Sequence, residues 1–134
     1  MKTITNLKIT VLMSLLCQLA SGDAGALPGQ GRVETRIREV AYDKAKIIEL
    51  VGYLGYQTHI QLPAGENLVG MSEGAPGDID IASDENDIWI RPKAAIADTN
   101  IDIKTTKHVY HIDYQARKNP PKDKRLITYS LTII

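Results

Sequence analysis

The chain has 134 residues with 16 basic and 16 acidic side chains, which gives no formal net charge at pH 7. Such a balance disfavours proteins that overall charge holds to nucleic acid or to anionic membranes, so any partner must be recognised by local shape and chemistry. Cys17 is the only cysteine, and we expect it to be removed with the N-terminal segment, so the mature domain must be stable without a disulfide.

Residues 1–26 have the organisation of a secretory signal peptide. Two lysines precede an apolar run over residues 9–20, and small residues follow it. The run is well short of the roughly 20 residues that a membrane-spanning helix needs, so cleavage is expected rather than anchoring. Residues 27–34 contain Pro and Gly without apolar periodicity, which indicates a flexible lead-in. The expected result is one exported domain over residues 35–134.

Beyond residue 35 the chain alternates apolar and polar residues with a period of two, the pattern of strands with one buried and one exposed face. Clusters of Pro, Gly, Asp and Asn separate these runs at the spacing of short antiparallel strands. The predicted buried sets are Tyr56, Thr58, Ile60 and Leu62; Ile79 and Ile81; Ile88 and Ile90; Ile101 and Ile103; and Tyr110, Ile112 and Tyr114. The pattern predicts an all-β fold, an antiparallel β-sandwich of about eight short strands.

Residues 47–54 fit two structures. Their apolar side chains also fit a helical stripe that Asp43 would cap, but the β-branched pair Ile47-Ile48 and two glycines disfavour a stable helix. A strand is therefore favoured here.

The C-terminal part divides into a loop and a strand. Residues 117–125 are basic and contain two consecutive prolines, which cannot belong to a central strand, so we expect an exposed loop. Residues 126–134 predict a final strand whose buried face carries Ile127, Tyr129, Leu131 and Ile133.

One short pattern resembles that of a serine hydrolase. Residues 70–74 read Gly-x-Ser-x-Gly with Ser72 at the centre, but the nucleophile elbow needs a helix after the strand, and here Pro76 and Gly77 lead into another strand. We therefore expect a non-enzymatic protein with no catalytic residue.

Metal sites are not expected either. His108 and His111 are three residues apart, which places them on opposite faces of a strand. Residues 78–87 start like a calcium loop, but Ala82 and Ser83 stand where an oxygen ligand and a glycine are required. The sequence therefore predicts neither metal nor cofactor.

Trp89 is one candidate for a protein interface. It should lie opposite the buried Ile88 and Ile90, where a large exposed aromatic favours protein contacts; the alternative is that a second layer covers it. The other interface candidates are Tyr110, Arg117 and Lys118. Because the basic loop lacks interleaved aromatic residues, direct binding of nucleic acid is not expected.

Several segments resemble the N-terminal domain of the TrbG/CagX family of type IV secretion and conjugation proteins. The segments are Val40-Ala41-Tyr42-Asp43, Gly55-Tyr56-Gln57-Thr58-His59-Ile60, Pro63-Ala64-Gly65-Glu66, and Ala97-Asp98-Thr99-Asn100-Ile101 leading to Tyr110-His111-Ile112. The side chains of Asp98 and Asn100 can also bond nearby backbone amides, which predicts a turn at Asp98-Thr99-Asn100 that starts the next strand.

The resemblance implies a structural subunit of a secretion core complex in the periplasm. It implies a homo-oligomeric ring around a channel for protein or DNA, beside a membrane-spanning core subunit and an outer-membrane lipoprotein. Family members usually bind the lipoprotein through a second β domain, and this sequence stops at Ile134. A hydrolase and an exported ligand- or carbohydrate-binding sandwich are the alternatives; the latter should line a concave pocket with aromatics, whereas the chain has no Phe and one Trp.

Overall fold

The computed structural model describes residues 36–134, so the predicted signal peptide (1–26) and lead-in (27–34) lie outside the described residues. The described part forms nine strands and one short 3₁₀ helix. In chain order they are β1 (Ile37–Val40), β2 (Ile47–Tyr53), β3 (Thr58–Gln61), β4 (Leu68–Glu73), β5 (Ile79–Asp84), β6 (Asp87–Pro92), β7 (Ile96–Thr105), β8 (Val109–Arg117), η1 (Lys124–Leu126) and β9 (Ser130–Ile133).

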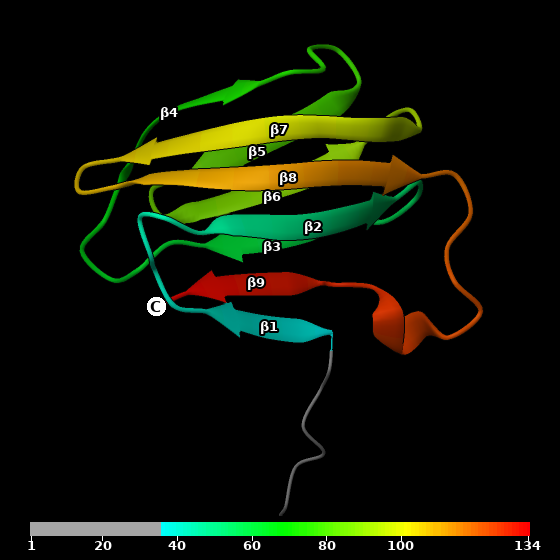
Figure 1. Ribbon diagram of the computed structural model, residues 1–134, viewed down its shortest axis with the longest axis horizontal. Helices are drawn as coiled ribbons and strands as arrows, with labels where there is room; N and C mark the ends of the chain where they lie inside the picture. Colours follow the sequence, from blue (N-terminus) through cyan, green and yellow to red (C-terminus); the bar gives the residue numbers. More distant parts are fainter. Residues whose placement is uncertain (1–35) are drawn as a thin grey trace, which may run out of the picture. The chain divides into compact units, whose positions relative to one another are not determined.

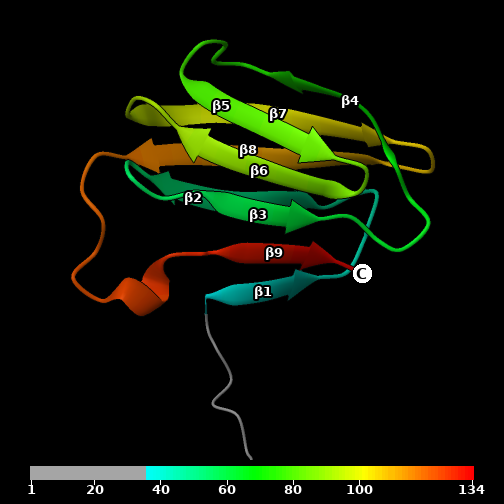
Figure 2. The same cartoon turned by 180° about the vertical axis from the view of Figure 1, so that it is seen from behind.

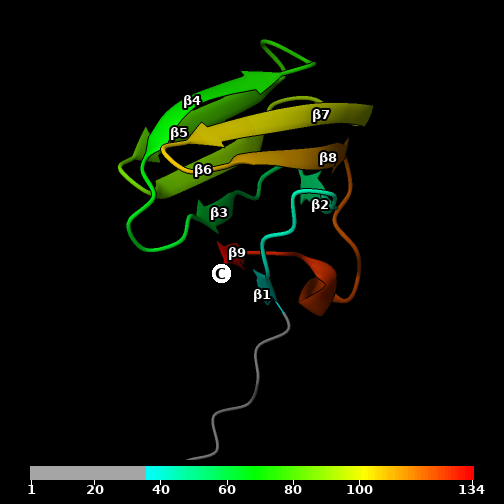
Figure 3. The ribbon, with the colours of Figure 1, turned by 60° about the vertical axis from the view of Figure 1, so that its left-hand side comes forward.

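The strands form two sheets. One has five strands in the order β1-β9-β3-β6-β5, and the other has four in the order β2-β8-β7-β4. Figure 1 shows the four-stranded sheet in front, and Figure 3, turned to the side, separates it from β3, β6 and β9. The all-β, two-sheet prediction is therefore confirmed.

The sheets are mixed rather than wholly antiparallel as predicted, and the strand number is nine. The pairings of β1 with β9, β9 with β3 and β2 with β8 are parallel. Period-two alternation gives the buried face of a strand but not its direction, which depends on the connections. Neighbours joined by short turns, such as β5 and β6, are antiparallel, whereas parallel neighbours need long connections.

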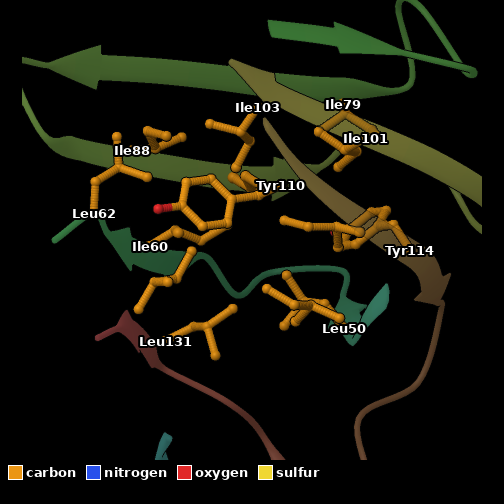
Figure 4. Packing of buried hydrophobic residues seen from close by; sticks show 14 of the residues in the cluster. Leu50, Ile60, Leu62, Ile79, Ile88, Ile101, Ile103, Tyr110, Tyr114 and Leu131 are labelled. Atoms are coloured by element: carbon orange, nitrogen blue, oxygen red, sulfur yellow. The ribbon is translucent and has the colours of Figure 1, made fainter. Parts of the chain in front are cut away.

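The inward faces of both sheets meet in one isoleucine-rich core. Figure 4 shows side chains from the two sheets packed against each other around Tyr110. The buried members include Ile60, Ile88, Ile90, Ile101, Ile103, Ile112, Tyr114, Leu131 and Ile133. These positions confirm the alternation that the sequence predicts in β3, β6, β7 and β8.

The segment forms a strand as favoured, because Ile47–Tyr53 is β2, and the turn that follows begins at Leu54. Its Gly52 lies directly against the hydroxyl of Tyr114 on β8, where a Cβ atom would overlap with that oxygen. A glycine is therefore required by close packing, and the same residue disfavours the helical alternative.

The C-terminal segment differs from its prediction. Residues 124–126 form η1, and only Ser130–Ile133 form strand. Asp123 caps η1 by accepting a hydrogen bond from the Arg125 amide, which competes with extended structure. Ile127 and Leu131 are buried as expected, but Tyr129 is 40% exposed and so does not belong to the buried face.

Candidate functional site: a buried clamp and two charged ends

A buried carboxylate joins two loops at one end of the fold. Glu66, in the β3–β4 loop, is 3% exposed. Its Oε2 accepts hydrogen bonds from Thr105 Oγ1 at 2.7 Å and from the Tyr110 hydroxyl at 2.8 Å. Its Oε1 lies 2.7 Å from Nδ1 of His108, which follows β7. We call Glu66, Thr105, His108 and Tyr110 the Glu66 clamp.

The clamp favours the ionised form of Glu66. Burial raises the pKa of a carboxyl group, but the hydrogen bonds from Thr105, Tyr110 and His108 outweigh it, so the pKa of Glu66 lies below its ordinary value. The same burial, together with the Glu66 charge, raises the pKa of Tyr110. The pair therefore consists of a carboxylate and a neutral phenol, with the phenol donating.

Tyr42 closes the clamp from the β1–β2 connection. Its ring centroid lies 3.9 Å from that of His108 and 5.3 Å from that of Tyr110. The clamp thus brings together three of the segments that carry the family resemblance, through Tyr42, Glu66 and Tyr110. Tyr110 is 3% exposed, so its prediction as an interface residue is wrong: its hydroxyl is used inside the domain.

The contacts of the clamp tie the β3–β4 loop to β7, β8 and the turn between them. Both Glu66 oxygens contact side chains of the clamp. An open depression of about 500 Å³ beside His108 is lined mainly by Tyr42, Thr105, Val109 and the three lysines Lys44, Lys104 and Lys107.

Among residues 36–134 there is no group of three or more His, Cys, Asp or Glu side chains placed to hold a metal ion. The described part of the chain also contains no helix long and apolar enough to cross a membrane.

Trp89 lies on the outward face of the five-stranded sheet. Its cross-strand neighbours are His59 on β3 and Ala82 on β5. The rings of His59 and Trp89 are stacked, with centroids 5.2 Å apart, and His59 Nε2 lies 2.6 Å from Asp87 Oδ1. The imidazole of His59 therefore stacks on one side of the indole, and the small, exposed Ala82 is the neighbour on the other side. We call Asp87, His59, Trp89 and Ala82 the Trp89 platform.

The tip of the β5–β6 hairpin, beside the platform, is acidic, whereas Arg91 is exposed farther along β6. Residues 78–87 contain five acidic side chains and no basic one. Asp84 and Glu85 are exposed at its tip, where Glu85 takes a φ of 51°. Within the described residues neither of them has an ion-pair partner.

The opposite end of the sheets carries the basic segment 117–125. Arg117 ends β8, and it is exposed together with Lys118, as their prediction as interface residues requires. Arg125 is held by Asp123, whose pKa is lowered to about 2 by the side-chain and backbone hydrogen bonds from Arg125. Lys124 lies over the ring of Tyr56, which stacks on Tyr129. Figure 2 shows this segment at one end of the fold and the β5–β6 hairpin at the other.

The predicted turn at residues 98–100 is instead part of β7. Asp98, Thr99 and Asn100 lie inside the strand, which has a register shift between Ile96 and Thr99. A bulge of this kind admits polar residues without ending the strand. Thr99 and Asn100 pack closely against Gly74, whose amide donates to the Asn100 carbonyl at 3.0 Å. These contacts join β7 to the turn that follows β4.

Ser72 lies within β4 opposite Asp102, and the chain continues from β4 through a turn into β5. The strand that the sequence favoured over a nucleophile elbow is therefore present. His108 contacts Glu66, whereas His111 contacts Asp102 at 2.8 Å, so the two histidines serve separate pairs.

The sequence did not identify Glu66 or the His59–Asp87 pair. Their partners are 28 to 44 residues away in the chain. The available signal for Glu66 was an acidic residue next to a Pro-Ala-Gly turn in a segment already noted for its resemblance.

Comparisons with known proteins identify one family. The model of the family CagX, described as conjugal transfer protein, matches residues 35–132. No curated protein matches the chain. Among solved structures the chain is similar to one described as "IG27 protein domain", with 12% sequence identity, a TM-score of 0.37, and coverage of 59% of this chain and 98% of that chain.

Proposed function

The chain belongs to the CagX family of conjugal transfer proteins, and on that premise we propose that it is a non-enzymatic structural subunit of a type IV secretion core complex. Its place is the periplasm, in a ring that lets protein or DNA cross the bacterial envelope. Its partners are further copies of itself and the membrane-spanning core subunit, in a complex that also contains the outer-membrane lipoprotein.

The family match over residues 35–132 carries this proposal. The distribution of chemistry supports it: the Glu66 clamp is held by its own hydrogen bonds, while charged side chains are exposed on the sheet faces and in the loops at both ends. A protein built to assemble needs a rigid scaffold and outward-facing patches, whereas an enzyme needs reactive groups in a water-excluding site.

Affinity purification from cells that assemble the secretion machine tests the proposal. A tagged full-length chain, solubilised from the envelope in mild detergent, should bring down the other core subunits. Recovery of the chain alone, in a strain whose core complex is shown to be intact by a second tagged subunit, would contradict the proposal.

Carbohydrate binding is the alternative that this experiment must exclude, because a tryptophan on an open sheet face can stack on a sugar ring. Binding to polysaccharide columns that is lost in Trp89→Ala, without any secretion subunit in the purified material, would favour that alternative. We expect no such retention, because Trp89 is the chain's only Trp and the chain has no Phe.

A further inference from the structure

The tip of the β5–β6 hairpin and the segment 117–125, which lie at opposite ends of the sheets, carry opposite, unpaired charge; Lys104 and Lys107 are also exposed at the hairpin's end of the sheets. At one end Asp84 and Glu85 project from the β5–β6 hairpin, and at the other Arg117, Lys118 and Lys122 are exposed. Within residues 36–134, none of these five side chains takes part in an ion pair or a side-chain hydrogen bond. Exposed charges of one sign that lack internal partners are available to a complementary surface.

These charged ends face opposite directions along the strands. Arg117 ends β8 and is paired with Tyr53 at the end of β2, just before the turn that enters β3. Asp87 is paired with Gln61, at the far end of β3. Strand β3 therefore runs from the basic end to the acidic end, and Figure 2 shows the two ends on opposite sides.

The Trp89 platform adds a preorganised aromatic beside the acidic hairpin. Asp87 holds His59, and His59 stacks on one face of Trp89, so little side-chain freedom remains to be lost on binding. On the other side of Trp89 the cross-strand neighbour is the small, exposed Ala82, and Trp89 itself is half-buried. A Lys or Arg placed there would contact both the ring face and the hairpin carboxylates.

We propose that the basic segment 117–125 of one copy docks on the acidic hairpin and the Trp89 platform of the next copy. The contact is heterologous because each copy uses two different surfaces, so it repeats around a ring or along a filament rather than closing a two-fold dimer. This inference rests on the proposed function, in which copies of the chain lie side by side.

Cysteine crosslinking in intact cells tests the contact with the full-length chain. Cys17→Ser removes the only natural thiol. Glu85→Cys is placed in one tagged copy and Lys122→Cys in a second copy with a different tag, and both are expressed in the strain that assembles the secretion machine. Under mild oxidation the two tags should appear in one disulfide-linked species. Asp113→Cys, at an exposed position on the outward face of β8, is the matched control and should not link to Lys122→Cys.

Charge reversal tests whether complementarity holds the contact. Asp84→Lys with Glu85→Lys, or Lys118→Glu with Lys122→Glu, should each lower crosslinking through neighbouring positions by about tenfold or more, because like charges then face each other. For this test the cysteines move to Ser83→Cys and Asn119→Cys, which leaves the reversed positions intact. When both reversals are combined in every copy, the crosslink should return.

Three results overturn the inference. The first is a Glu85→Cys species linked to itself, which indicates a two-fold contact. The second is a crosslink that charge reversal leaves unchanged. The third is absence of the crosslink while the same variants still co-purify with the core subunits. This result contradicts the head-to-tail contact but leaves the proposed function standing. Failure of the unmodified chain to co-purify with the core subunits would instead contradict the proposed function.

Discussion

Replacement of Glu66 by alanine should cost much of the stability of the domain. The change removes the acceptor of the Thr105 and Tyr110 hydroxyl groups and the carboxylate next to His108. A hydrogen bond to a charged group contributes about 1.5–3 kcal/mol, but contacts in one cluster do not add. Thr105 can still donate to the His108 carbonyl at 3.2 Å, and His108 is partly exposed to water. The buried Tyr110 hydroxyl is therefore the group that is left without a hydrogen-bond partner. We expect the free energy of unfolding to fall by about 3 kcal/mol.

Urea unfolding of residues 27–134 measures this loss through the fluorescence of the chain's single tryptophan, Trp89. Glu66→Gln is the matched variant: it keeps an oxygen for the hydroxyl groups but not the charge, and should lose about 1 kcal/mol. Glu85→Ala, at an exposed position, should lose almost nothing. A loss below about 1 kcal/mol in Glu66→Ala, or equal losses in the alanine and glutamine variants, would refute this account of the clamp.

The difference in the free energy of unfolding between the wild type and Glu66→Gln should depend on pH, and the direction of the pKa shift gives the sign. The pKa of Glu66 is lower in the folded state than its ordinary value of 4.5, so the charge stabilises the fold above pH 4.5. That contribution is lost as the pH falls through the folded pKa. The stability difference between the wild type and Glu66→Gln should therefore be full at pH 6 to 7 and should narrow in acid; a difference that grows in acid would mean the pKa is raised instead.

Further predictions concern packing, chemistry and assembly. Gly52→Ala should destabilise by about 1–3 kcal/mol in thermal unfolding, and Tyr114→Phe in the same chain should recover part of the loss because the overlapping hydroxyl is gone. Ser72→Ala should leave thermal stability unchanged. The unmodified chain should not hydrolyse ester substrates, so the variant should have no activity to lose. Light scattering on residues 27–134 should give a monomer or weak oligomer; a stable closed ring of this fragment alone would contradict that expectation.

The buried faces of the strands could be predicted because the information is local. In β6 the pair Ile88 and Ile90 alternates with Trp89, and any strand with that alternation must turn its isoleucines to a core. The direction of a strand is not local in this way. β9 has the same alternation whether it runs parallel or antiparallel to β3, and only the path of residues 118–129 decides between them.

The polar contacts were less predictable because their partners are distant in sequence. Glu66 is 39 residues from Thr105 and 44 from Tyr110, so its acceptor role depends on how the two sheets are joined. The segment 98–100 shows the opposite failure: its side chains suit a turn locally, but pairing with β8 keeps it in a bulged strand. Trp89 was placed on the correct face, whereas its stacking on His59 needed the register of β3 and β6.

Crosslinking in intact envelopes tests most directly whether this chain is an assembly subunit. A photoreactive amino acid is placed at an exposed position such as Lys118, with buried Ile112 as the control position, and the crosslinked proteins are identified by mass spectrometry. We predict that the exposed position captures other secretion core subunits and further copies of this chain in the periplasmic fraction. A mature chain found in the cytosol, or one that captures no secretion subunit in cells with an active machine, would contradict the account.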